Sequence, residues 1–199
     1  MLRRLRGGAI AKCLVWSDEL SDPASPAPPG AAFKPVDAKS FANLLLDWAE
    51  QATISVSPMK LQKLLYYCHA DFLIVTGSPL LQQEFEAWEY GPVIPSLFHE
   101  FKAHGSEPIN SRAFRFDPVS CRREQAPPCK LGPYESVIRA SFGIYAKHSA
   151  SALSNMSHSE SGPWAETLRR FTNGSPRGRS IENRVIFEYH RRQVAQSVH

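Results

Sequence analysis

The sequence predicts a mainly α-helical protein with a small two- or three-stranded β element, an α+β class built as a single compact helical domain. Along most of the chain, apolar residues recur every three or four positions, which is the period of an amphipathic helix. Serine, aspartate and proline stand where these periodic stretches begin, and glycine stands where several of them end. Two short aromatic segments break the helical period and are typical of strands.

The first 35 residues are predicted to lie outside that domain. Ser21 to Pro35 contains five prolines among alanines and serines, a composition that buries too little apolar surface to offset its ordering entropy. We therefore interpret residues 1–35 as an extension and a proline-rich flexible linker, and residues 36–195 as the folded domain. With 199 residues, 43% of them hydrophobic, the chain is long enough to bury a sizeable core.

Two long helices are predicted to open the domain. Asp37 is placed to cap the first helix, which should end near Ala52. Ser57 and Pro58 supply a cap and a first-turn proline for the second helix, which Gly77 terminates. The second helix has an apolar stripe made of Leu61, Leu64, Leu65, Cys68 and Phe72. Three polar residues lie off this stripe, namely Lys60, Lys63 and Asp71.

The middle of the chain is predicted to hold the β element. Residues 85–90 are rich in aromatic side chains and too short for a stable helix, so they are predicted to form a strand. Residues 113–116 alternate in polarity and predict a second strand that pairs with the first. A short helix over 95–103, ending at Gly105, separates the two. Residues 117–130 contain three prolines and a net positive charge and are predicted to be a loop.

Further helices are predicted in the C-terminal third. Their starts are marked by Gly132-Pro133, by Ser149, by Gly162-Pro163-Trp164 and by a serine cap at Ser180. The expected total is six or seven helices.

Composition and cysteine usage exclude several classes of protein. The net charge of +4 and the pI near 8.9 fall short of a nucleic-acid-binding signature. The four cysteines show no CxxC pair, which argues against a zinc ribbon and a disulfide framework. No apolar run is long enough to span a bilayer. Lys12 interrupts the apolar stretch near the N-terminus, so we expect a cytoplasmic protein with no membrane partner.

No established catalytic or cofactor-binding motif occurs in the sequence, and we expect no enzyme activity, no cofactor and no metal. One conceivable metal site consists of His69 and Asp71 with His158. Side chains two positions apart on a helix point to different sides, so this site is disfavoured. A thiol nucleophile is also disfavoured, because Cys68 lies on the apolar stripe, where a free thiol behaves as a small hydrophobe.

Basic residues gather in two groups. The first contains Arg177, Arg179, Arg184, Arg191 and Arg192, and the second contains Arg112, Arg115, Arg122, Arg123 and Lys130. Acidic residues dilute both groups, and no row of aromatic residues interleaves them. A solvated face is therefore favoured over nucleic-acid contact.

Two blocks have a residue order that composition does not explain. Trp88 and Tyr90 flank the turn at Gly91-Pro92, where they can serve as packing anchors or as a recognition surface. His158 lies at the C-terminal end of a predicted helix, where an imidazole can bind free carbonyl groups. A functional alternative is that His158, Trp164 and Trp88 converge on one recognition surface.

These blocks and a third one form a pattern. The first block is Leu61-Gln62-Lys63-Leu64-Leu65-Tyr66, the second is Glu86-Ala87-Trp88 with Tyr90-Gly91-Pro92-Val93, and the third is Leu153-Ser154 with Ser157-His158 and Pro163-Trp164. In this order they resemble the Panacea domain, also known as the SocA-like or phage-associated GepA family of bacterial and prophage proteins. The resemblance covers about residues 38–192. Ser157 stands where the family more often has threonine, and the residues before Val36 are not part of the family pattern.

The resemblance implies an antitoxin of a type II-like toxin-antitoxin system, which neutralises a toxin encoded beside it by binding that protein directly. In the SocA-like branch it also implies a proteolytic adaptor that delivers the toxin to ClpXP. The candidate partner-binding residues are Trp88, Tyr90, His158 and Trp164, because aromatic side chains dominate interface energetics. The alternative is a DNA-binding regulator of a prophage or toxin-antitoxin operon that uses the C-terminal arginines.

Overall fold

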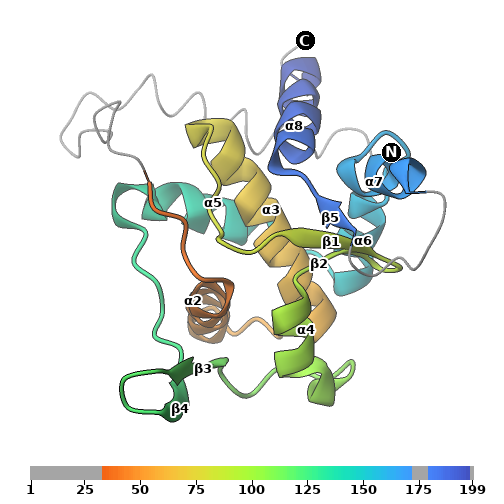
Figure 1. Ribbon diagram of the computed structural model, residues 1–199. Helices are drawn as coiled ribbons and strands as arrows, with labels where there is room; N and C mark the ends of the chain where they lie inside the picture. The colour runs from red at the N-terminus through yellow and green to blue at the C-terminus, as the bar shows by residue number, and fades with distance from the viewer. Residues whose placement is uncertain (1–32, 172–178, 198–199) are drawn as a thin grey trace.

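The long helix α3 (Pro58–Thr76) crosses the middle of the domain, and the other elements pack around it (Figure 1). The computed structural model describes residues 33–171 and 179–197. These residues contain seven α-helices and two small antiparallel sheets, which confirms the predicted fold class. Besides α3, the helices are α2 (Ala38–Gln51), α4 (Pro95–Phe101), α5 (Glu135–Tyr145), α6 (Ala150–Ser157), α7 (Pro163–Arg170) and α8 (Asn183–Ser197).

The first two helices begin and end as predicted. The carboxylate of Asp37 accepts hydrogen bonds from the N–H groups of Lys39 and Ser40, and α2 ends one residue before Ala52. Ser57 caps α3 in the same way, and Gly77 ends it with a φ of 69°, in the left-handed region that glycine tolerates. These signals are local, so neighbouring residues are enough to reveal them.

The expectation of a single apolar stripe on α3 was wrong. Every residue from 61 to 73 is buried, including Lys63, His69 and Asp71. The reason is that helices and strands cover this part of α3 on all sides, so it has no solvent face (Figure 1).

The main sheet has three strands in the order β2-β1-β5. They are β1 (Phe85–Trp88), β2 (Gly91–Val93) and β5 (Ser180–Ile181), and both pairings are antiparallel. Trp88 pairs with Gly91, so a two-residue loop joins β1 to β2. The sheet thus joins two segments that lie close in sequence to a third that lies far away.

Three predictions about this region were wrong. The second strand, β3 (Phe114–Asp117), does not pair with β1, because β2 and β5 occupy both edges of β1. It pairs instead with β4 (Arg122–Gln125), which lies inside the segment 117–130 that was predicted to be a loop. Ser180 does not cap the last helix but lies in β5, and α8 begins at Asn183.

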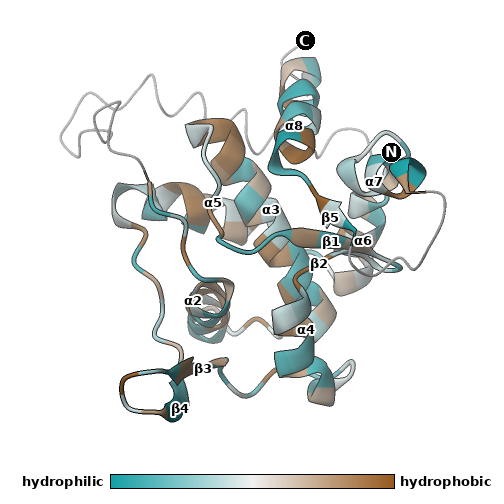
Figure 2. Ribbon diagram, in the orientation of Figure 1, coloured by the Kyte–Doolittle hydropathy of each residue, from teal (hydrophilic) through white to brown (hydrophobic). Residues whose placement is uncertain are grey.

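The described chain joins the core from its first residue. Phe33 packs on Phe72 of α3 and on Tyr134, with ring centroids 4.6 and 5.4 Å apart. Residues 1–32 of the predicted extension and linker lie outside the described residues, as does Arg177 of the basic groups. On α8, hydrophobic residues gather at the end next to β5. The turns of α8 nearer the C-terminus are mostly hydrophilic (Figure 2).

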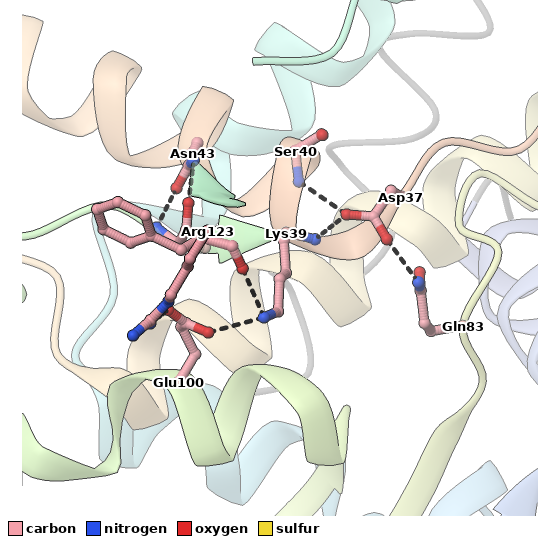
Figure 3. Close-up of polar contacts among 9 residues, drawn as sticks. Asp37, Lys39, Ser40, Asn43, Gln83, Glu100 and Arg123 are labelled. Carbon is pink, nitrogen blue, oxygen red and sulfur yellow. Dashed lines mark hydrogen bonds and ion pairs between the residues drawn. The ribbon is translucent and has the colours of Figure 1, made fainter. Parts of the chain in front are cut away.

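The hairpin β3–β4 stands apart from the core but is held firmly at its base. None of its strand residues is buried. The buried side chain of Asn43 in α2 donates to the carbonyl oxygens of Ala113 (3.1 Å) and Ala126 (2.6 Å), and its Oδ1 accepts the N–H of Ala113 (2.7 Å). One amide side chain therefore links the two ends of the hairpin to the body (Figure 3).

A second link to the body is ionic. Glu100 of α4 pairs with Lys39 (2.7 Å) and with Arg123 of β4 (2.8 Å). It also accepts the N–H of Phe114 (3.1 Å), and Lys39 donates to the carbonyl oxygen of the same residue (2.7 Å). Both Lys39 and Arg123 thus converge on one half-buried carboxylate (Figure 3).

We expect Asn43→Ala to loosen the hairpin and to lower overall stability. The change leaves the buried N–H of Ala113 and the carbonyl of Ala126 without this partner, at a cost of about 1–3 kcal/mol for each group. Urea unfolding should show the loss, and hydrogen exchange should show faster exchange in β3 and β4 than in α3. Asn110→Ala is the control, because Asn110 is exposed. Equal protection of the hairpin in both variants would contradict the anchoring role of Asn43.

Candidate functional site

The predicted partner-binding residues meet at the turn between β1 and β2, next to α6 and α7 (Figure 1). We call residues 88–92 the clamped turn. The indole N–H of Trp164 donates to the carbonyl oxygen of Trp88 at 2.6 Å. Nε2 of His158 lies 3.0 Å from the carbonyl oxygen of Glu89. The His158 and Trp164 rings also contact each other edge to face, with centroids 4.2 Å apart.

Two more side chains, one from α3 and one from α6, bind the same turn. The hydroxyl of Ser154 donates to the carbonyl oxygen of Tyr90 at 3.0 Å. Nζ of Lys63 donates to the carbonyl oxygen of Pro92, also at 3.0 Å. Four of the five carbonyl groups in the clamped turn are therefore bound by side chains from α3, α6, α7 and the end of α6.

His158 is placed to use both of its ring nitrogens. Its Nδ1 lies 2.6 Å from the carbonyl oxygen of Ser154, while its Nε2 faces Glu89. A neutral imidazole donates from only one nitrogen, so both hydrogen bonds form together only in the imidazolium state. His158 caps the C-terminal end of α6, as predicted, and a cation is favoured at that end.

Gly91 is required by the close packing under the turn. Its φ is 97°, which side-chain-bearing residues rarely adopt. A Cβ atom there would lie 2.5 Å from Oγ of Ser157 and 2.7 Å from Nζ of Lys63. Lys63 is 0% exposed, and burial lowers its pKa to about 7. The turn, a buried amine and a buried hydroxyl therefore fit together with no spare space.

Gln62 holds the strand that leaves the turn. Its side-chain amide donates to the carbonyl oxygen of Ile94 (3.2 Å) and accepts the N–H of the same residue (2.8 Å). Seven residues of the three blocks lie in the hydrophobic core, and they are Leu61, Leu64, Leu65, Tyr66, Ala87, Val93 and Leu153. The blocks thus combine core residues with donors that hold one turn.

Tyr90 is the exposed member of the four candidate residues. Its side chain is 63% exposed, whereas Trp88, His158 and Trp164 are half-buried. Trp88 packs against Phe98 of α4 (4.9 Å between centroids), and its indole N–H donates to Glu86 (2.7 Å). The structure therefore brings all four together, with three of them shaping the turn and Tyr90 standing out from it.

Sequence reasoning had placed Lys63 and Ser154 in the family pattern but not among the site residues. Their role depends on contacts with a turn about 30 and 60 positions away in the chain. One local signal was present: Lys63 interrupts a run of leucines and tyrosines. A lysine inside such a run must reach a polar partner or lose its charge.

The metal site weighed from the sequence does not assemble. His69 binds Asn183 through Nε2 (2.9 Å) and accepts the N–H of Leu81 at Nδ1 (3.4 Å), and burial lowers its pKa to about 4. Asp71 faces Tyr145 instead, and burial raises the pKa of this carboxyl to about 7. Within residues 33–171 and 179–197, no group of three or more His, Cys, Asp or Glu side chains is placed to hold a metal ion.

The basic groups are partly neutralised by ion pairs. Arg184 pairs with Glu188 (2.9 Å) and with Glu182 (3.8 Å), and Arg112 pairs with Asp47 and Glu50. In the part of the chain that the structure covers, no helix has the length and apolar character needed to cross a membrane.

These observations define a class of protein: a mainly helical domain in which separate sequence blocks fix one exposed turn. Residues 61–165 match the family described as "Antitoxin SocA-like, Panacea domain". The chain belongs to this family, and the resemblance found in the sequence is confirmed. It is 41% identical over 130 residues to Antitoxin SocA of Caulobacter vibrioides (strain NA1000 / CB15N), covering 65% of this chain and 69% of that relative. No solved structure matches the chain significantly.

Family membership supports an antitoxin role, with a toxin as partner, and a regulatory rather than catalytic protein.

Proposed function

We propose that this protein neutralises a neighbour-encoded toxin in the cytoplasm by binding it directly through the clamped turn, without chemistry of its own. The observation that carries the proposal is the convergence of family-motif donors on residues 88–92, which holds Tyr90 outward. The described cysteines, Cys68, Cys121 and Cys129, are free thiols, which supports a reducing compartment.

A fixed turn is a suitable base for a binding residue. Ordering a mobile loop during association costs free energy, and a loop that is already held avoids that cost. Tyrosine has a large ring, few rotatable bonds and a hydroxyl, and is enriched among the residues that dominate interfaces. Exposed Glu89 lies beside it and adds a charge that can select the partner.

Co-expression with the product of the adjacent gene tests the antitoxin role. The adjacent product alone should stop growth, and growth should recover when this protein is present. The proposal fails if the adjacent product is harmless alone, or if it stays toxic in the presence of this protein.

Tyr90→Ala tests the binding site. We expect the affinity for the toxin to fall at least about tenfold, because loss of a central aromatic residue typically costs 2 kcal/mol or more. The variant should keep the stability of the parent, since the side chain is exposed. Phe171→Ala is the matched control, because Phe171 is an exposed aromatic residue at the end of α7. Similar binding of Tyr90→Ala and the parent would remove the clamped turn from the interface.

Delivery of the bound toxin to ClpXP is a further step that the family resemblance implies, and a host without ClpX tests it. If binding alone neutralises the toxin, cells without ClpX stay protected and the toxin accumulates in complex. If delivery is needed, protection is lost with ClpX although the complex still forms. Measuring growth and toxin half-life in both hosts separates the two modes.

A further inference from the structure

The hairpin β3–β4 carries the two most exposed large apolar side chains of the described residues. Val119 in its turn is 92% exposed and Phe116 on β3 is 65% exposed. In the antiparallel register, Phe116 lies opposite Arg123 and Phe114 lies opposite Gln125, so these four share one face. Hydrophobic and hydrophilic residues alternate along β3, hydrophobic residues mark the loop tip, and hydrophilic residues mark β4 (Figure 2). The hairpin displays an aromatic face.

The register also determines which backbone groups point away from the hairpin. In an antiparallel pair, residues that exchange backbone hydrogen bonds alternate with residues whose N–H and C=O groups face outward. The N–H of Ala126 donates to the carbonyl of Ala113, which sets the phase of this alternation. The outward residues are therefore Phe114 and Phe116 on β3 and Arg123 and Gln125 on β4.

The two edges differ in how far they are blocked. On β3, the outward N–H of Phe114 donates to Glu100 and its C=O accepts from Lys39, so side chains from the body occupy the part of that edge next to Phe114 (Figure 3). On β4, no hydrogen bond among the described residues reaches the outward backbone groups of Arg123 or Gln125. An open strand edge is a template for pairing with another chain.

The open edge carries positive charge. Arg122 and Arg123 follow each other on β4 and both are exposed. The nearby acids already have partners: Glu124 pairs with Arg115 (2.8 Å), and Asp117 accepts two backbone N–H groups of the turn. Arg123 pairs with Glu100 (2.8 Å), whereas Arg122 forms no ion pair within the described residues, so an approaching chain would meet the unpaired charge of Arg122.

We propose that the edge of β4 binds an extended acidic segment of a partner protein, which adds as a third strand. Alternating backbone donors and acceptors at the edge fit a polypeptide, because a nucleic-acid backbone offers phosphate acceptors but no matching donors. The aromatic face receives apolar side chains of the added strand, and Arg122, on the opposite face of β4, receives its carboxylates. A second copy of this edge would bring its own arginines to the site, so a different, acidic chain is favoured.

A pair of synthetic peptides tests the proposal, one alternating valine with glutamate and the other alternating valine with lysine. We expect only the glutamate peptide to shift the amide NMR signals of Phe116, Arg123 and Gln125, with an affinity that falls as salt rises. Arg122→Glu should reverse the preference between the two peptides. This arginine makes no contact with Glu100, so the base of the hairpin stays intact.

Two variants at one position separate strand addition from simple charge attraction. Gln125→Pro removes an outward N–H that the hairpin ladder does not use, and proline is tolerated at such edge positions. It should weaken binding of the glutamate peptide at least about tenfold, while Gln125→Ala binds like the parent, because one lost backbone pair is worth roughly 1.4 kcal/mol.

Several results would overturn the proposal. They are equal binding of the two peptides, signal shifts confined to other elements, equal binding by Gln125→Pro and Gln125→Ala, and no binding at all. Binding of a short DNA duplex in preference to the glutamate peptide would assign the arginines to nucleic acid. Concentration-dependent shifts of the β4 signals without peptide would assign the edge to a second copy. Unchanged protection of α3 amides verifies that each variant is folded.

Discussion

Gly91→Ala is expected to be the most damaging single-methyl change in the described chain, lowering the free energy of unfolding by about 3–5 kcal/mol. Two causes add. The backbone φ of 97° is strained for alanine, and the new Cβ would lie 2.5 Å from Ser157 Oγ and 2.7 Å from Lys63 Nζ. Both atoms belong to buried side chains with hydrogen bonds to keep, so neither can retreat without losing one. Urea unfolding measures the effect.

Two other glycines separate these causes. Gly77 also has a positive φ, of 69°, but a Cβ there would meet nothing within 4 Å, so Gly77→Ala reports backbone strain alone. Gly143, in the exposed part of α5, has neither problem, and Gly143→Ala should stabilise the protein by up to about 1 kcal/mol. We expect the cost to rise in the order Gly143, Gly77, Gly91. If Gly91→Ala lowers the unfolding free energy no more than Gly77→Ala does, the side chains under the turn can move to make room for the methyl group.

Lys63→Met is expected to change how stability depends on pH. Burial lowers the pKa of Lys63 from 10.5 to about 7 in the folded protein. Between these two values the unfolded chain binds a proton that the folded chain does not. The contribution of Lys63 to the unfolding free energy should therefore be highest above pH 10.5, fall as pH drops toward 7, and lose on the order of 3–5 kcal/mol in all. Methionine has a similar length and no charge, so the variant lacks this dependence.

The difference between the two proteins isolates Lys63, because all other titrating groups are common to both. Relative to the parent, Lys63→Met should gain stability as pH falls from 10.5 to 7. It should also bind the toxin less well, since the carbonyl of Pro92 loses its donor and the turn is less well held. Lys147→Met, at an exposed position, is the control and should follow the parent. Parallel pH profiles for Lys63→Met and the parent would show that Lys63 is not desolvated in solution.

The elements that could be predicted are those whose signals are local. The caps at Asp37 and Ser57 and the stop at Gly77 depend on residues within a few positions, and each appears in the structure. Strand pairing is different, because β5 comes from almost 100 residues beyond β1 and only two of its residues take part. Two residues are too few to show the alternating polarity of a strand, so the sequence does not distinguish β5 from the start of α8.

Four residues of the candidate site were proposed from the sequence, but Lys63, Ser154 and the physical arrangement of the turn were not. Aromatic residues at a turn and a histidine at a helix end could each be recognised from the sequence. Which backbone groups they bind could not, because the donors and the turn are brought together only by packing on α3. The same limit explains why the burial of Lys63 and Asp71 was not predicted. Helical spacing shows which residues share a side of a helix, but it does not show how many sides the neighbouring elements cover.

The clamped turn also sets an order of events during synthesis. Its strand leaves the ribosome early, but the donors at Ser154, His158 and Trp164 are made more than 60 residues later. β5, which completes the sheet, is made later still. A nascent or truncated chain that ends before residue 154 would carry Tyr90 on a turn without most of its supports. If the clamped turn binds the partner as proposed, competence to bind arrives with the C-terminal third, and an incomplete chain does not compete with a finished one for the same partner.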